Sequence, residues 1–249
     1  MRLFSEHPGA AMSMATSPRL QAQLAEAVSQ RGVSTALETG TYLGEGSTTL
    51  LAGLLAAQPQ PGLTTIEANW RFWRKARERL AAFPFVNCLW GRTVAAEEAL
   101  AFMQSDEALL HHERYGDVFI DNLDDPLAFY SRECKGDLFE TIDAGDAAFQ
   151  RDQAAHYAGD DLLRVHLQRL RGERPLILLD SAGGIGWLEF QITMEVMADA
   201  DFLLLLDDVH HLKHFRSLAA VRRDAAFELL DADEDAGWAL AWHHSVPQG

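Results

Sequence analysis

The chain has 249 residues, 48% of which are hydrophobic, and its formal net charge at pH 7 is −16. This length suits one α/β domain with an insertion, and this hydrophobic fraction provides a sizeable core and excludes global disorder. The acidic balance argues against a nucleic-acid-binding protein and against a surface that binds anionic membranes.

Residues 17–110 alternate predicted helices with predicted strands. A helix is expected over 17–31, where apolar residues recur on one face and Ser17-Pro18 supply a cap and a first turn. Short apolar runs predict strands at 33–38, 63–67 and 86–90. The stretches between and after these strands predict helices at 47–57, 70–82 and 93–110.

The last 75 residues of the sequence, 175–249, continue the alternation. Apolar strands are predicted at 176–180 and 202–207, with a helix over 188–198 between them, which indicates a parallel sheet covered on both faces. Segments 227–231 and 238–242 predict a closing antiparallel hairpin. The expected fold is therefore a single α/β domain over 1–249, a doubly wound, Rossmann-like, mostly parallel sheet with a C-terminal antiparallel hairpin.

An insertion at about 111–175 interrupts the alternation between the third and fourth strands. The connection 91–175 has 85 residues, whereas a helical crossover needs far fewer. Asp160 is expected to cap a helix within it. We expect the insertion to pack over the carboxyl edge of the sheet and to present exposed aromatic residues such as Tyr130 and Tyr157 to a substrate. An oligomer contact or a scaffold is an equally good interpretation.

A glycine-containing turn follows the first predicted strand. Gly40 and Gly44, with a third glycine two residues later, precede a helix expected to begin near Ser47. Glycines in such a turn let the backbone approach a ligand closely, and the helix offers free N–H groups to an anionic group. The spacing is not the G-x-G-x-x-G of dinucleotide binding, which argues against an NAD-dependent oxidoreductase. The absence of Gly-Lys-Ser/Thr excludes a phosphate-binding P-loop.

This turn resembles the first motif of class I S-adenosylmethionine (SAM)-dependent methyltransferases, an acidic residue followed by G-x-x-x-G. Here the acidic residue is Glu38 and the glycines are Gly40 and Gly44. The resemblance implies that SAM is the cofactor and that Glu38 and Gly40 hold its amino-acid end, with Tyr42, Gly44 and Ser47 nearby. An ordinary tight strand–helix turn is the structural alternative.

Glu67 ends the second predicted strand, 27 residues after Gly40. A carboxylate at this position can accept hydrogen bonds from both ribose hydroxyls in nucleoside-binding doubly wound folds. The resemblance implies the same role for Glu67, and it places Arg92 where the family wraps adenine. Trp70 would cover the adenine face, and a core role for Trp70 is equally plausible.

Three carboxylates follow the fourth and fifth strands, namely Asp180, Asp207 and Asp208. They should meet at one edge of a parallel sheet, where mutual repulsion calls for a cation, and Mg²⁺ prefers such oxygen ligands. The pattern is similar to metal-dependent O-methyltransferases of the catechol and sugar types, which implies a metal that binds the substrate hydroxyl. In the alternative interpretation, Asp208 caps a helix and Asp180 is an exposed strand end.

One departure from the catechol-type enzymes concerns the base. Their lysine three residues after the strand-four aspartate is replaced here by Gly183. His210, His211 and His214 are the candidate bases, because histidine titrates near neutrality. A zinc site built from these histidines alone is less favoured, because the three aspartates already offer an oxygen site.

The sequence thus predicts a SAM-dependent O-methyltransferase that uses a divalent cation and acts on a hydroxyl of a small molecule, sugar or natural product. The alternatives are a metal-independent N- or C-methyltransferase and a non-catalytic SAM- or nucleoside-binding protein. Cys88 and Cys134 form no disulfide framework, and no signal-peptide or membrane-spanning pattern is visible. We therefore expect a cytoplasmic protein without nucleic-acid or membrane partners, which could form a homo-oligomer.

Overall fold

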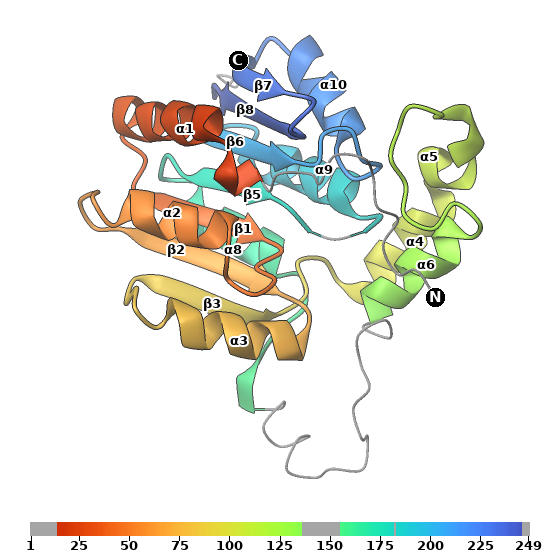
Figure 1. Cartoon of the computed structure of the whole chain (residues 1–249), viewed down its shortest axis with the longest axis horizontal. Helices are drawn as coiled ribbons and strands as arrows, with labels where there is room; N and C mark the ends of the chain where they lie inside the picture. Colours follow the sequence, from red (N-terminus) through yellow and green to blue (C-terminus); the bar gives the residue numbers. More distant parts are fainter. Residues whose placement is uncertain (1–13, 136–154, 182, 246–249) are drawn as a thin grey trace.

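The computed structural model describes residues 14–135, 155–181 and 183–245, and their course is shown in Figure 1. Within these residues, eight strands form one sheet in the order β4-β3-β2-β1-β5-β6-β8-β7. The strands are β1 (Thr35–Thr39), β2 (Gly62–Glu67), β3 (Val86–Gly91), β4 (Tyr157–Gly159), β5 (Leu176–Leu179), β6 (Phe202–Asp207), β7 (Phe227–Asp233) and β8 (Trp238–His243).

The sheet is mostly parallel. β1 lies between β2 and β5 and is parallel to both, and the parallel pairing continues outward to β3, β4 and β6. β8 is antiparallel to β6 and to β7, which closes the sheet with a hairpin. The predicted doubly wound sheet with a C-terminal antiparallel hairpin is confirmed.

Helices cover both faces of the sheet. They are α1 (Pro18–Arg31), α2 (Ser47–Leu55), α3 (Trp70–Leu80), α4 (Ala96–Ser105), α5 (Glu107–Leu110), α6 (Pro126–Lys135), α8 (Leu162–Leu170), α9 (Gly186–Met197) and α10 (Phe215–Arg223), with single 3₁₀ turns η1 (Met14–Thr16) and η2 (His112–Arg114). Among the described residues, no helix has the length and apolar character needed to span a bilayer.

Successive residues of the buried strands face two separate cores. Ile177 and Leu204 pack with residues of α8, α9 and α10, whereas Leu176 and Leu203 pack with residues of α1 and α2. Side chains alternate across a strand, so an unbroken apolar run supplies both cores at once. This explains why β5, and β6 up to Asp207, have no polar face.

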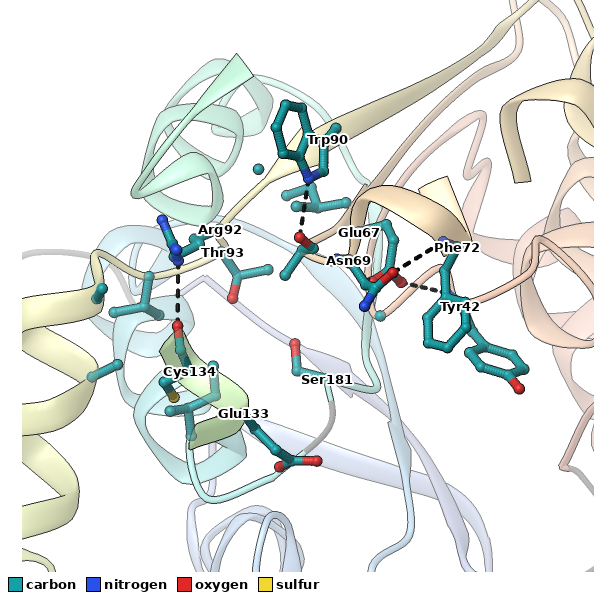
Figure 2. A pocket seen from close by; sticks show the side chains of 18 of the residues that line it. Tyr42, Glu67, Asn69, Phe72, Trp90, Arg92, Thr93, Glu133, Cys134 and Ser181 are labelled. Atoms are coloured by element: carbon teal, nitrogen blue, oxygen red, sulfur yellow. Dashed lines mark hydrogen bonds between the residues drawn. The ribbon is translucent and has the colours of Figure 1, made fainter. Parts of the chain in front are cut away.

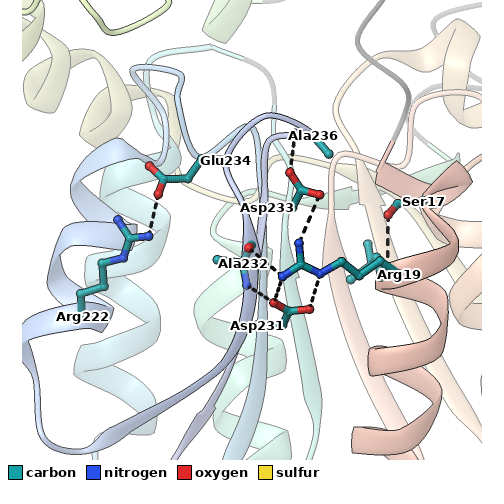
Figure 3. A network of polar contacts seen from close by, with 9 residues as sticks. Ser17, Arg19, Arg222, Asp231, Ala232, Asp233, Glu234 and Ala236 are labelled. Atoms are coloured by element: carbon teal, nitrogen blue, oxygen red, sulfur yellow. Dashed lines mark hydrogen bonds and ion pairs between the residues drawn. The ribbon is translucent and has the colours of Figure 1, made fainter.

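Helix α1 is attached to the C-terminal hairpin by charged side chains. Arg19 Nε donates to Asp231 Oδ2 at 2.9 Å, and Arg19 also lies 3.6 Å from Asp233 (Figure 3). The start of the same helix is capped by Ser17 Oγ, which accepts a hydrogen bond from the Leu20 amide at 3.3 Å. Because Arg19 is solvent-exposed, this contact orients α1 on β7 more than it stabilises the fold.

The structure corrects two predicted helices. The single helix expected over 93–110 is divided at Asp106, whose backbone is extended and whose buried carboxylate binds the Arg216 guanidinium at 2.8 Å. The helix expected after Asp160 begins at Leu162 without a side-chain cap: Asp161 stands at the N-cap position and makes no capping hydrogen bond, and the Asp160 side chain binds Arg92.

The insertion contains an edge strand and a crossover helix that connects to β5. β4 adds to β3, and α8 leads from β4 to β5. Helices α4, α5 and α6 lie together beside one end of the sheet (Figure 1). Tyr130 is not exposed as expected: it is fully buried, and its hydroxyl accepts a hydrogen bond from the Asp121 amide at 3.0 Å. Tyr157 is 37% exposed and lies in β4.

Candidate functional site

Gly40 directly follows β1, at a point where two loops nearly touch. Its φ is +82°, and a Cβ at this position would lie 2.2 Å from the carbonyl oxygen of Asp180, directly after β5. Only glycine allows both this backbone conformation and this approach. Gly44 has a different role, because a Cβ there would lie 3.1 Å from Ala76 of α3. Gly40 therefore shapes the sheet edge, and Gly44 allows α3 to pack closely.

Glu38 is fully buried beneath this turn. Its carboxylate accepts hydrogen bonds from Ser47 Oγ at 2.7 Å and from Thr65 Oγ1 at 2.6 Å. Burial raises its pKa to about 7, although the two hydroxyls act in the opposite direction. Glu38 thus joins β1, β2 and the start of α2, and it supports the turn from below.

Glu67 lies at the carboxyl end of β2 and faces a cavity. Its two carboxylate oxygens accept hydrogen bonds from the Tyr42 and Asn69 amides, each at 2.7 Å. Burial raises its pKa to about 7, and the two backbone hydrogen bonds act to lower it. Each oxygen keeps further acceptor capacity for a ligand.

The raised pKa values predict that ligand-free protein loses stability as pH rises. Glu38, Glu67 and Glu133 have pKa values of about 7 in the folded protein against an ordinary value of 4.5. A folded-state pKa above the unfolded value means that the stabilisation is complete below pH 4.5 and is lost as pH rises through 7. Urea unfolding between pH 4.5 and 8 should show a falling free energy of unfolding. Glu38→Gln should flatten this slope by up to about 1.4 kcal/mol per pH unit, and an unchanged slope would contradict the assignment.

The cavity has a volume of about 330 Å³ and lies along the carboxyl edge of β1, β2, β3 and β5. Figure 2 shows Trp90 at one end, Tyr42 and Phe72 at one side, and Glu133 and Cys134 across from them. Its lining is Gly40, Tyr42, Ile66, Glu67, Ala68, Asn69, Phe72, Trp90, Gly91, Arg92, Thr93, Val94, Ala96, Ala99, Glu133, Cys134, Tyr157, Asp180, Ser181 and Ile185. A concave, mostly apolar cavity with a few polar groups is typical of small-molecule sites.

Four of the seven residues predicted to hold the cofactor line this cavity, namely Gly40, Tyr42, Glu67 and Arg92. The other three, Glu38, Gly44 and Ser47, lie behind it and hold the turn in place. Their predicted contacts with SAM stay predictions.

Arg92 connects the cavity wall to the insertion. Its guanidinium donates to the Cys134 carbonyl at 3.3 Å, to the Tyr157 hydroxyl at 2.9 Å and to Asp160 at 3.1 Å. Because three elements meet at one side chain, Arg92 positions α6 and β4 against the end of β3.

Trp70 has the core role of the two considered for it. It is buried, and its ring packs against Trp73 and Trp90 with centroid separations of 4.9 and 4.7 Å. The aromatic ring of α3 that lines the cavity is Phe72, whose centroid lies 4.5 Å from that of Tyr42. Trp70 is closer to β2 in the sequence, but the helical period of α3 turns Phe72, and not Trp70, toward the cavity.

Asp180, Asp207 and Asp208 are brought together at the ends of β5 and β6. Oxygen atoms of the three carboxylates lie within 4.8 Å of one another. The Lys213 ammonium lies among them, with Nζ 2.9 Å from Asp180 Oδ1 and 2.9 Å from Asp208 Oδ2. A Cβ at Gly186 would lie 2.5 Å from Lys213 Cβ, so that glycine leaves room for the lysine.

The charged groups of this cluster shift one another's pKa values. Burial acts to lower the pKa of Lys213, but Asp180 and Asp208 outweigh burial and raise it. Burial and the neighbouring Asp180 raise the pKa of Asp207 well above its ordinary range. Burial also acts on Asp208, yet Lys213 outweighs it and lowers the pKa of Asp208. The donor set has the chemistry that Mg²⁺ prefers, and a buried ammonium already supplies positive charge to it.

The three predicted bases do not line the cavity. His211 Nδ1 accepts a hydrogen bond from the Lys213 amide at 3.1 Å, and Nε2 lies 3.1 Å from Asp121 Oδ2, so both nitrogens are engaged. His214 is fully buried, and burial lowers its pKa well below the ordinary value. His210 is exposed and lies against Gly237 of the hairpin turn. Their proposed role in proton transfer stays a prediction.

Sequence reasoning missed Phe72, Glu133, Cys134 and Lys213 as residues of this region. Phe72 follows Glu67 by five positions, and the helical period offered a signal for it. Lys213 stands in the same short run as the three histidines, where its charge opposite three aspartates offered another signal. Glu133 and Cys134 gave none, because only the packing of α6 brings them to the cavity.

No protein-family model matches the chain, and no curated protein matches it. Among solved structures, the O-methyltransferase from Bacillus cereus in complex with SAH is 13% identical, with a TM-score of 0.43, over 92% of this chain and 82% of that chain. The O-methyltransferase TomG from Streptomyces achromogenes, in complex with SAM, is 12% identical, with a TM-score of 0.44, over 96% and 92%. A methyltransferase-like protein from Silicibacter pomeroyi is 16% identical, with a TM-score of 0.40, over 94% and 90%.

Proposed function

We propose that this chain is a SAM-dependent methyltransferase and that the cavity along the carboxyl edge holds SAM. The observation that carries the proposal is Glu67, a buried carboxylate at the end of β2 that is fixed by two backbone amides and faces the cavity. Such a group suits the two ribose hydroxyls of a nucleoside. Gly40 leaves open backbone for the amino-acid end, and Arg92 with Trp90 borders the adenine end.

The methyl acceptor in this proposal is a hydroxyl of a small molecule. The cavity continues past Asp180 and Ser181 to residues of α6, and its lining there includes the apolar Ile185. An acceptor placed in this part would meet the cofactor across the end of β5. The protein would contribute chiefly by aligning the acceptor oxygen with the sulfonium methyl group and by excluding water.

The finer part of the proposal is that Asp180, Asp207 and Asp208 hold a Mg²⁺ ion beside the acceptor. Their oxygen chemistry and mutual distances support it, and when bound the metal would make the acceptor hydroxyl more acidic. Lys213 favours the alternative, a methyltransferase that needs no metal, because its ammonium already contacts two of the three carboxylates. Metal entry therefore requires the ammonium to leave these oxygens.

The cofactor part is tested by SAM binding to wild type and to Glu67→Ala. Loss of the carboxylate removes the ribose acceptor and leaves two backbone amides without their partner, so we expect about 10- to 100-fold weaker binding by isothermal calorimetry. Glu45→Ala is the matched control, because Glu45 is exposed and pairs with Arg79; its affinity should equal that of wild type. No heat of binding for SAM or SAH to wild type at millimolar concentration would defeat the proposal.

Turnover tests the acceptor and the metal. SAM consumption is followed with catechols and with sugars, with added Mg²⁺ and with EDTA. Methylation that stops in EDTA supports the metal, and methylation that survives EDTA supports the metal-independent alternative. SAM binding with no methyl transfer to any hydroxyl would favour a non-catalytic nucleoside-binding protein.

A further inference from the structure

Glu133 of α6 has a buried carboxylate oxygen, Oε2, for which the described residues supply no hydrogen-bond partner. Its Oε2 is inaccessible to solvent and makes no hydrogen bond within the part of the chain that the structure describes. A buried polar oxygen without a partner is costly, and one that a folded protein retains calls for an explanation such as a catalytic role. Glu133 also lines the cavity assigned above to SAM and its acceptor.

The position of Glu133 relates it to the end of β5. A Cβ at Gly183, three residues after Asp180, would lie 2.3 Å from Glu133 Oε2. A side chain at position 183 would therefore displace the Glu133 carboxyl group, whereas glycine leaves room for it. Figure 2 shows Glu133 beside Cys134, across the cavity from Trp90 and below Ser181. This is the acceptor end of the cavity, away from Glu67.

The groups around Glu133 set its acidity. Burial has the largest effect, Asp121 raises the pKa further, Lys213 lowers it, and the result is a pKa of about 7. The neighbouring Tyr130 and Cys134 are themselves buried with raised pKa values, so neither supplies a charge near neutrality. A carboxyl group that gains and loses a proton near neutral pH is suited to general base chemistry.

We propose that Glu133 is the general base that takes the proton from the acceptor hydroxyl during methyl transfer. The acceptor oxygen forms a bond to the methyl carbon, the carbon–sulfur bond of SAM breaks with its electron pair going to sulfur, and the hydroxyl proton passes to the Glu133 carboxylate. The products are the methyl ether, SAH and a protonated carboxyl group, which returns its proton to water when products leave. This inference rests on the proposed function and names a residue of that same site.

The inference also explains the distribution of polar groups in the cavity. Val94, Ala99 and Ile185 line it together with Glu133. An acceptor with an apolar body and one hydroxyl directed toward Glu133 would satisfy both features. The predicted histidines lack such a position, because His211 is engaged at both nitrogens and none of the three lines the cavity.

The test compares Glu133→Gln with wild type, using SAM and catechol as the probes. Gln keeps the size and the neutral character that Glu133 has at low pH, so the fold should be retained. We expect kcat to fall about 100- to 10,000-fold, with SAM affinity within about twofold of wild type, which is under 0.5 kcal/mol. Wild-type kcat should rise with pH through an apparent pKa near 7, and that rise should vanish in the variant.

Glu97→Gln is the matched control, because it removes the same charge from an exposed position on α4. The kcat and the pH profile of this control variant should equal those of wild type. Full turnover of catechol by Glu133→Gln with the wild-type pH profile would overturn the inference while leaving the proposed function intact. Failure of wild type to bind SAM would instead overturn the proposed function.

If Glu133→Gln has a lower melting temperature than wild type, Glu133→Asp serves as the second variant. It should keep the pH-dependent rise in kcat with a lower maximum, and loss of that rise would count against Glu133 as the base.

Discussion

Lys213→Met should destabilise the ligand-free protein by about 3 kcal/mol at neutral pH, because it leaves buried carboxylates without their cation. The Lys213 side chain is 5% exposed and contacts Asp180 and Asp208 at 2.9 Å each. We take the lower end of the range for broken buried pairs because the Asp208 side chain is 43% exposed and water screens it. Urea unfolding measures the loss, and it should shrink at low pH, where the aspartates accept protons instead.

Lys75→Met is the control for this change. Lys75 is exposed on α3, so the same substitution there should alter the free energy of unfolding little. Equal stability of Lys213→Met and wild type would show that the ammonium is dispensable and that the acidic cluster is neutralised by protonation alone.

The same variant decides how the acidic cluster obtains its positive charge. A ligand at a hundredfold excess over its dissociation constant adds about 2.7 kcal/mol to stability, so Mg²⁺ binding is visible as a rise in melting temperature. If Mg²⁺ stabilises both proteins, the metal displaces the ammonium in wild type. If Mg²⁺ stabilises Lys213→Met but not wild type, the lysine ammonium occupies the place of the metal in wild type. That result would support the metal-independent alternative. No effect on either protein would remove the metal from the proposal.

The fold could be predicted because the buried strands β5 and β6 are recognisable in the sequence. β5 and β6 are continuous apolar runs, and the helix α9 connects them. β4 was missed because its three residues, Tyr157–Gly159, carry no apolar run and gain their strand conformation from pairing with β3. The division of the helix at Asp106 depends on Arg216, which lies 110 positions further along the chain. Local patterns cannot encode such a partner.

The candidate site was predictable to the extent that it lies on strand ends. Glu67 and Asp180 follow directly from where β2 and β5 stop, because parallel strands deliver their carboxyl ends to one edge. Glu133 and Lys213 reach the same edge only through the packing of α6 and of the loop after β6. Their roles depend on the direction of each side chain and on the groups buried around it. The spacing of residues in the sequence predicts neither.

Gly40, directly after β1, is a position where adding a single methyl group should lower the free energy of unfolding through the backbone alone. Gly40→Ala should lower stability by at least about 3 kcal/mol, because a Cβ at φ +82° carries strain of about 1–3 kcal/mol and also collides with the backbone directly after β5. The collision is with the Asp180 carbonyl oxygen, 2.2 Å away, which belongs to backbone and cannot rotate aside.

The matched control is Gly53→Ala in α2. Gly53 is exposed, with nothing within 4 Å of an added Cβ, so alanine there should raise stability by about 0.5–1 kcal/mol. Opposite signs for the same chemical change are the expected result, measured by urea unfolding of the two variants side by side.

SAM binding extends this prediction to function. Relief of the collision requires the end of β1 and the start of the loop after β5 to separate, and both Gly40 and Asp180 line the cavity. The cofactor would then lose the closely fitted backbone on which its amino-acid end is proposed to rest. We expect Gly40→Ala to bind SAM too weakly for calorimetry even at temperatures where it remains folded, whereas Gly53→Ala should bind as wild type does. A folded Gly40→Ala protein with wild-type affinity would move the amino-acid end of SAM away from this turn.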